Sequence, residues 1–386
     1  MWQLSRSSAQ TRRALTTVLF LAVIGAATVL SQAGFAEADQ SVVTAPTARA
    51  VPQTKSKSIW GPPSIDGVSQ FPIYRDLGVG IYQMAIPWNE VAPNRPKHPT
   101  NPADPAYIWP TSLQPTLAEA RRYGMKVSMM VIGAPAWANG GHSDRSWAPR
   151  NPASYANFMK AISKKYPSIH MWMIWGEPNR RNNFKPLSPS RTGPLNAHQA
   201  RAPRLYGRIL DAAYVALKSR SRYNMVIGGN TYTAAGPDSI STYQWLRYIR
   251  LPNGRMPRMD FWGHNPFTFR IPKLRSKPSP KGRVDFSDLR RLTKKLDHYY
   301  KGKRLRLFLS EFGVPGGGTD AELGYDLSYQ AQAKWIRAAF KYKKSLKRIY
   351  TLGWVHPFDR PDVGITTGLL TADGKPKPGY YAFRAG

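Results

Sequence analysis

Short apolar runs alternate with longer amphipathic stretches from residue 58 to the end of the chain. Short apolar runs bounded by turn residues are typical of strands that are covered on both faces, whereas apolar residues at three- and four-residue spacing predict helices. The predicted strands are 58–60, 80–87, 126–133, 170–175, 224–229, 260–263, 306–310 and 349–354. The predicted helices between them are 70–77, 112–123, 152–165, 197–219, 242–249, 286–300 and 328–346.

The number and order of these elements predict a single-domain (β/α)8 TIM barrel over residues 57–386. A doubly wound sheet is the less favoured alternative, because no Gly-x-Gly-x-x-Gly follows the first strand. The last unit departs from the alternation. Residues 368–375 contain an Asp-Gly pair typical of a hairpin, and a short closing helix is expected at 379–384.

The N-terminus has the pattern of an export signal. Arg12 and Arg13 precede the apolar stretch 14–30, and the small residues Ala36 and Ala38 follow. This pattern predicts a cleaved signal peptide at 1–38, an unstructured tether at 39–56 and a secreted or cell-envelope protein. The alternative is an uncleaved anchor, which is the one way in which we expect this chain to contact a membrane.

Charge is the unusual feature of the composition. The chain of 386 residues holds 56 Lys and Arg against 22 Asp and Glu, a formal net charge of +34. This balance favours an anionic partner such as an acidic polysaccharide, and the alternative is a general bias toward basic secreted proteins. No nucleic-acid-binding motif is present, so nucleic acid is not an expected partner. The absence of cysteine excludes thiol nucleophiles and Cys-ligated metals.

Two of the predicted strands end on a glutamate. Glu177 follows the run 170–175, and Glu311 follows the run 306–310. A carboxylate at such a place is costly unless it is paired, hydrogen-bonded or used, and a parallel barrel brings its strand ends together around one site. Two carboxyl groups are the minimum equipment for cleaving a glycosidic bond. The alternative is that both glutamates form structural salt bridges in a basic protein.

Aromatic, amide and imidazole side chains follow most of the other strands. Aromatic rings can stack on pyranose faces, and amides can bind hydroxyl groups, so these residues predict a sugar-binding groove. For any one Trp or isolated His, core packing is the alternative. The expected substrate-binding residues are Trp88, Trp137, Asn179, Asn230, His264, Asn265, Trp354 and His356.

The sequence resembles the clan A glycoside hydrolases, and most closely their families 39 and 5. Trp-Gly-Glu-Pro-Asn at 175–179 and Ser-Glu-Phe-Gly at 310–313 are similar to the clan's fourth- and seventh-strand signatures. Pro-Trp-Asn-Glu-Val at 87–91 and Gly-His-Asn-Pro at 263–266 agree. The resemblance implies a retaining O-glycosyl hydrolase of polysaccharide or oligosaccharide, with Glu177 as acid/base and Glu311 as nucleophile. It implies no metal and no cofactor.

Three positions depart from the pattern of the clan. Gly176 stands where relatives place Asn, Gln83 where they often place Arg, and Phe267 where a Tyr commonly supports the nucleophile. Loss of the contact to the substrate 2-hydroxyl removes stabilisation of the transition state. These departures motivate an alternative function: a catalytically weak barrel that binds polysaccharide at the cell surface.

Basic residues are concentrated in two predicted loops. Residues 180–185 follow the fourth strand, and residues 270–283 follow the sixth. Loops after strands lie on the catalytic face of a TIM barrel. Cations there would attract an acidic glycan, which makes an anionic substrate the expected class.

Overall fold

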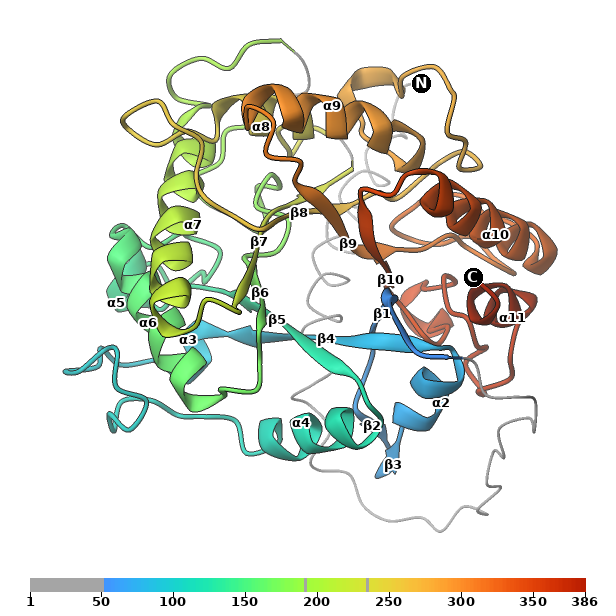
Figure 1. Cartoon of the computed structure of the whole chain (residues 1–386), viewed down its shortest axis with the longest axis horizontal. Coiled ribbons are helices and arrows are strands. Elements are labelled where there is room, and N and C mark those ends of the chain that lie inside the picture. Colours follow the sequence, from blue (N-terminus) through green and yellow to red (C-terminus); the bar gives the residue numbers. More distant parts are fainter. Residues whose placement is uncertain (1–51, 191–192, 234–235) are drawn as a thin grey trace, which may run out of the picture.

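The computed structural model describes residues 52–190, 193–233 and 236–386. In this part of the chain, eight parallel strands close into a barrel, and helices surround it (Figure 1). The predicted (β/α)8 fold is therefore confirmed. The expected signal peptide at 1–38 and the tether up to residue 51 lie outside the described residues.

The barrel strands follow one another around the ring in chain order. β10 pairs in parallel with β1 and closes the barrel, with Trp354 opposite Ile59. A two-stranded antiparallel pair, β2 (Ser64–Ile65) and β3 (Val68–Ser69), lies outside the ring. The barrel strands are β1 (Thr54–Trp60), β4 (Val79–Pro87), β5 (Lys126–Ile132), β6 (Met171–Ile174), β7 (Met225–Tyr232), β8 (Phe261–Asn265), β9 (Arg306–Phe312) and β10 (Ile349–Trp354).

Each predicted helix is present, and several begin at a side-chain cap. Asn151, Ser241 and Ser328 each accept a hydrogen bond from a backbone N–H of the first turn, which stabilises the helix start. The main helices are α2 (Phe71–Asp76), α4 (Leu113–Arg122), α6 (Pro152–Lys165), α7 (Arg201–Arg220), α8 (Thr242–Tyr248), α9 (Leu289–Tyr299), α10 (Tyr329–Ser345) and α11 (Pro378–Arg384). Short turns of helix are α3 (Trp88–Val91), α5 (Ala136–Asn139), η1 (Pro280–Gly282), η2 (Phe286–Asp288) and η3 (Pro361–Val363).

The first strand begins earlier than expected, at Thr54 rather than at residue 58. The Gln53 side chain donates to the carbonyl oxygens of Val79 and Tyr123, and Thr54 N–H donates to Gly78. These bonds attach the chain to β4, so residues 54–56 belong to the barrel and not to the tether. Among the described helices, none is both long and apolar enough to span a bilayer.

The expected hairpin at 368–375 is a turn and not a pair of strands. A single antiparallel bridge joins Leu370 to Pro376, and Thr371 N–H donates to Lys375. Two prolines, Pro376 and Pro378, lie in the returning segment. A ladder of paired strands does not form there because proline has no N–H to donate.

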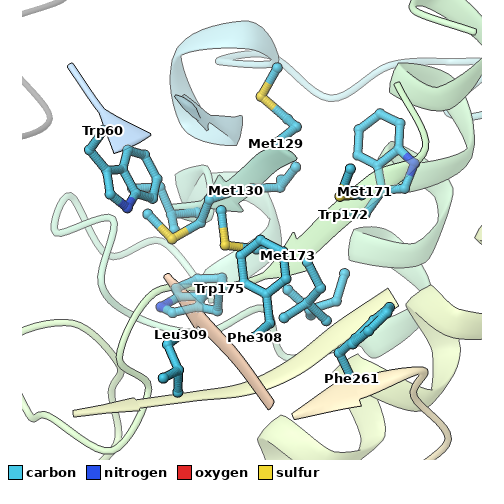
Figure 2. Close-up of a cluster of buried hydrophobic side chains, with 14 of the residues drawn as sticks. Trp60, Met129, Met130, Met171, Trp172, Met173, Trp175, Phe261, Phe308 and Leu309 are labelled. Carbon is cyan, nitrogen blue, oxygen red and sulfur yellow. The ribbon is translucent and has the colours of Figure 1, made fainter. Parts of the chain in front are cut away.

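The barrel interior is rich in methionine and aromatic side chains. Met130 and Met173 point toward Trp60 and Phe308 (Figure 2). Trp172 alternates to the other face of β6, where it is fully buried. Packing in the core is therefore the role of Trp172.

Candidate active site

The chain bends sharply where β6 ends. Trp175 has φ 65° and Glu177 has φ 43°, values in the left-handed region that non-glycine residues rarely adopt. Two hydrogen bonds hold this turn: Asn230 Nδ2 donates to the Trp175 carbonyl at 2.8 Å, and the Trp175 indole N–H donates to the Asn183 carbonyl at 2.7 Å. Such conformations persist only where the surroundings determine them, and they cluster at functional sites.

Glu177 is buried, and both of its carboxyl oxygens have donors. Its side chain is 2% exposed. Oε1 accepts a hydrogen bond from Asn265 Nδ2 at 2.8 Å. Oε2 accepts from Arg180 Nη1 at 3.0 Å and from Asn183 Nδ2 at 3.4 Å. These donors offset the cost of burying the carboxylate.

Asn265 connects Glu177 to the neighbourhood of the second glutamate, Glu311. Asn265 lies at the end of β8, and its Oδ1 accepts a hydrogen bond from Ser310 Oγ at 2.7 Å. Glu311, the next residue on β9, is half-buried. Burial raises the pKa of Glu311 well above its usual range, and the nearby Asn265 side chain opposes only part of that rise. The structure thus brings Glu177, Glu311 and Asn265 together.

Arg180 links two loops above the strand ends. Its Nη1 lies 3.0 Å from Glu177 Oε2 and 3.1 Å from Glu322 Oε1, in the loop after β9. Its guanidinium carbon lies 4.3 Å from the centre of the Tyr232 ring. The sequence placed Arg180 in a basic loop on this face and Tyr232 at a strand end, but it did not indicate Glu322. Glu322 lies in no motif, so no pattern could have found it.

Three carboxyl groups, those of Glu177, Glu311 and Glu322, lie near one cation, Arg180, so their negative charges are only partly compensated. Burial, and then the charges of Glu177 and Glu322, raise the pKa of Glu311 well above its usual range. Burial also raises the pKa of Glu177, and the Arg180 cation opposes that rise. The pKa of both carboxyl groups is thus raised by burial, that of Glu311 more strongly, and Arg180 opposes the rise at Glu177.

Each of the three residues that depart from the clan pattern makes a specific contact in the structure. A Cβ on Gly176 would lie 2.8 Å from Met130 Sδ, so the methionine occupies the space of a side chain there. The Gln83 amide donates to the Ser310 carbonyl at 2.8 Å. The Phe267 ring packs against the Tyr232 ring with centres 5.8 Å apart.

Two of the expected substrate-binding amides brace the strand ends. Asn179 is fully buried, donates to the Ile240 carbonyl at 2.9 Å and accepts from Tyr232 N–H at 2.8 Å. Asn230 is also buried, and it holds the Trp175 carbonyl. In these positions both amides support the turn around Glu177 and do not reach the surface.

The expected sugar-stacking tryptophans are largely part of the core. Trp88 is fully buried, and it packs edge-on against Trp137 with ring centres 5.5 Å apart. Trp137 is partly exposed, and its indole N–H donates to Ala92 at 2.8 Å. Trp354 is fully buried, and its indole N–H donates to the His356 and Thr367 carbonyls. Of the three rings, Trp137 alone is partly exposed.

The two expected histidines are held by neutral partners. His264 is fully buried between Thr231 Oγ1 at 2.9 Å and the Val284 carbonyl at 2.8 Å. His356 Nδ1 lies 2.7 Å from Thr367 Oγ1. Burial lowers the pKa of each to about 4, so both rings are neutral at neutral pH. Their described hydrogen bonds do not reach Glu177 or Glu311.

The charge of the second basic loop is partly neutralised within the protein. Arg270 pairs with Asp285 at 2.7 Å and with Asp288 at 3.2 Å. Within the residues that the structure describes, no group of three His, Asp or Glu side chains could hold a metal ion.

The barrel is similar in structure to known glycoside hydrolases. It matches a family 39 glycoside hydrolase from the gut symbiont Bacteroides cellulosilyticus WH2 with a TM-score of 0.59 and 15% identity, over 87% of this chain and 63% of that one. A glucosidase from Croceicoccus marinus matches with a TM-score of 0.58 and 14% identity, over 87% and 66%. A family 39 β-xylosidase from Caulobacter crescentus matches with a TM-score of 0.56 and 15% identity, over 87% and 72%.

At the level of sequence, no family model matches the chain, and no curated protein matches it. The chain spans less than two thirds of the length of the first two structural relatives. At these identities the likeness shows the fold alone. The structural neighbours of this (β/α)8 barrel are thus family 39 glycoside hydrolases of clan A and related glycosidases.

Proposed function

We propose that the chain is an exported retaining O-glycosyl hydrolase that acts on extracellular or cell-envelope glycan. The observation that carries the proposal is the arrangement of Glu177 and Glu311 around Asn265 at the carboxyl ends of β6, β8 and β9. Active sites of TIM barrels lie at these strand ends, and paired carboxyl groups perform glycoside hydrolysis.

In the proposed reaction, Glu311 attacks the anomeric carbon while Glu177 protonates the oxygen of the leaving group. Water, deprotonated by Glu177, then releases the sugar from Glu311. This double displacement requires carboxyl groups about 5–5.5 Å apart and retains the anomeric configuration.

The electrostatics of the free site set a condition on these roles. A general acid must carry a proton, whereas Arg180 stabilises the charged form of Glu177. The proposed cycle therefore includes a shift of the proton from Glu311 to Glu177 when substrate binds. If no such shift occurs, the two glutamates have exchanged roles.

Azide rescue separates the two assignments. Azide is a small nucleophile that needs no general base. With a β-glycoside, the Glu177→Ala variant is expected to form a glycosyl azide of retained configuration, because Glu311 still forms the covalent intermediate. The Glu311→Ala variant is expected to form the inverted azide by direct attack. The opposite pattern would overturn the assignment of roles.

An acidic glycan is the proposed class of substrate. The formal net charge of +34 and the basic residues 180–185 beside the site favour an anionic polymer. The signal-like N-terminus supports export. The mechanism uses the two carboxyl groups and requires neither a metal nor a cofactor.

A catalytically weak polysaccharide-binding barrel is the second candidate. It is favoured by Met130, whose sulfur fills the space of the clan's asparagine at Gly176, and by the ion pair with Arg180, which favours the charged form of Glu177. Glycan binding without turnover on any substrate would support this candidate and contradict the first.

A further inference from the structure

A cleft lies on the outer flank of the barrel, between α7 and the segment that follows α8. Its volume is about 820 Å³, within the range of small-molecule binding sites. Five arginines line it: Arg201, Arg204, Arg208, Arg247 and Arg250.

These five arginines have no carboxylate partner among the described ion pairs. Asp211, an acidic residue of α7, pairs instead with Arg258 at 2.8 Å. Some arginines elsewhere do have acidic partners, as Arg348 has Asp297 and Arg384 has Asp76. The cleft therefore concentrates positive charge that the described part of the protein does not neutralise.

Three of the arginines lie on one face of α7. Arg201, Arg204 and Arg208 are exposed at positions i, i+3 and i+7, so their side chains project to the same side. They occupy the first two turns of a 20-residue helix whose N-cap, Ala200, makes no side-chain cap. The positive end of the helix dipole adds to their charge.

The other two arginines lie beside tyrosine rings on the opposite side of the cleft. Arg247 lies 5.6 Å from the centre of the Tyr248 ring, and Arg250 lies 5.5 Å from that of Tyr299. Arg250 is also held by donation to the Gly254 carbonyl at 2.9 Å. These contacts fix cations on the wall that faces α7.

We propose that this cleft is a second binding site, which takes the anionic groups of an acidic polysaccharide outside the catalytic centre. Guanidinium groups bind carboxylate, sulfate and phosphate oxygens in bidentate geometry, so several arginines can bind successive charged groups of one chain. That the ligand is a glycan rests on the proposed function, whereas the anion binding rests on the cleft itself.

The form of the cleft favours a glycan over nucleic acid. Single-stranded nucleic acids are bound by stacking of bases on exposed aromatic rings. Tyr248 and Tyr299 are only partly exposed, and each has an arginine close to its ring. The cleft thus offers charge without an open stacking surface.

The test measures binding of fluorescein-labelled heparin, polygalacturonate, neutral dextran and a single-stranded oligonucleotide by anisotropy. The cleft variant is Arg201→Gln, Arg204→Gln, Arg208→Gln. The matched control is Lys334→Gln, Arg337→Gln, Lys341→Gln. Its three residues are exposed at the same spacing on α10, on the other side of the barrel, and it loses the same charge (Figure 1).

We expect the cleft variant to bind at least one acidic glycan about tenfold or more weakly, because it loses three charge-assisted contacts. We expect the control variant to change that affinity by less than about twofold, because exposed charges remote from the ligand are screened by salt. Dextran is expected not to bind.

Equal weakening in both variants would overturn the inference, because net charge alone would then explain binding. Tighter binding of the oligonucleotide than of either glycan, lost in the cleft variant, would assign the cleft to nucleic acid. The same measurements on Glu311→Gln keep the inference separate from the proposed function. Unchanged binding there supports the cleft whether or not the wild type shows turnover.

Discussion

The sulfur atom of Met130 lies where a side chain at Gly176 would have to go, 2.8 Å from the position of a Cβ. Gly176 directly precedes Glu177, at the position where clan A relatives place an asparagine. Met130 on the neighbouring strand β5 fills that space with apolar atoms. The departure at Gly176 is therefore part of the packing of the barrel interior.

The first prediction concerns this contact. Gly176→Ala is expected to lower the free energy of unfolding by about 1–3 kcal/mol, because the new methyl group overpacks the core. Met130→Ala alone is expected to cost about 2–5 kcal/mol through the cavity it leaves. Urea unfolding measures both. In the double variant the costs should not add, since the methyl group then enters the cavity. Additive costs would show that the two residues do not compete for space.

The second prediction concerns Asn265. Asn265→Ala removes the donor to Glu177 Oε1 and the acceptor for Ser310. A hydrogen bond to a charged group contributes about 1.5–3 kcal/mol, so turnover is expected to fall about 10–100-fold. Steady-state kinetics measure the loss, and thermal unfolding shows that the variant is folded. Unchanged turnover in a folded variant would remove Asn265 from the site.

The third prediction concerns the pH dependence of activity. Burial raises the pKa of Glu177 and the Arg180 cation opposes that rise, so Arg180→Gln should raise the pKa further. If Glu177 is the general acid, the alkaline limb of the pH profile of kcat/KM moves to higher pH. The reason is that an acid with a higher pKa stays protonated up to a higher pH. Arg180→Lys should restore part of the original profile. Arg181→Gln, an exposed neighbour, is the control and should leave the limb in place. A limb that does not move in Arg180→Gln would contradict the role of Glu177.

The fourth prediction concerns stability. The pKa of Glu311 is raised in the folded protein, so the folded state binds more protons than the unfolded state above the usual glutamate pKa. The free energy of unfolding must then fall as the pH rises through this interval. Glu311→Gln should remove that fall, and the variant should be more stable than the wild type at pH 8 but not at pH 4. Glu119→Gln on the outer helix α4 is the control. If the free energy of unfolding had the same pH dependence in Glu311→Gln and in the wild type, a raised pKa of Glu311 would be excluded.

The fold could be predicted from the sequence because its signals are local and repeated. Each buried strand is a short apolar run, and each helix is longer and amphipathic. The predicted order of strands and helices is therefore unchanged when an element boundary is misplaced by a few residues. The misjudged segments depend on contacts with distant residues. The start of β1 is fixed by the hydrogen bonds that the Gln53 side chain donates to Val79 on β4 and to Tyr123. No local pattern in the sequence reveals these contacts.

The candidate site could be predicted only in part. Glu177 and Glu311 stand out because each follows an apolar run, and Asn265 follows a third. Asn179 and Asn230 have the same local appearance, but they brace the turns after β6 and β7. A polar residue after a strand can face the ligand or support the backbone, and sequence position does not separate the two.

Glu322 is a site residue that the sequence did not indicate. It lies in the loop after β9 with no motif around it, and it enters the site only through its ion pair with Arg180. Likewise, five arginines scattered over residues 201–250 form one cleft only after α7 and α8 have packed. Charges that meet through tertiary structure leave no pattern along the chain.

The most direct test of the central claim is hydrolysis of a panel of aryl glycosides and dyed polysaccharides, neutral and acidic. The wild type is compared with Glu177→Gln and Glu311→Gln. We predict turnover in the wild type that collapses in both variants, with an acidic glycan as the best substrate. Turnover that survives Glu311→Gln would contradict the proposed nucleophile. If no substrate were turned over but acidic glycan still bound, the proposed glycosidase activity would be contradicted and the polysaccharide-binding function would be supported.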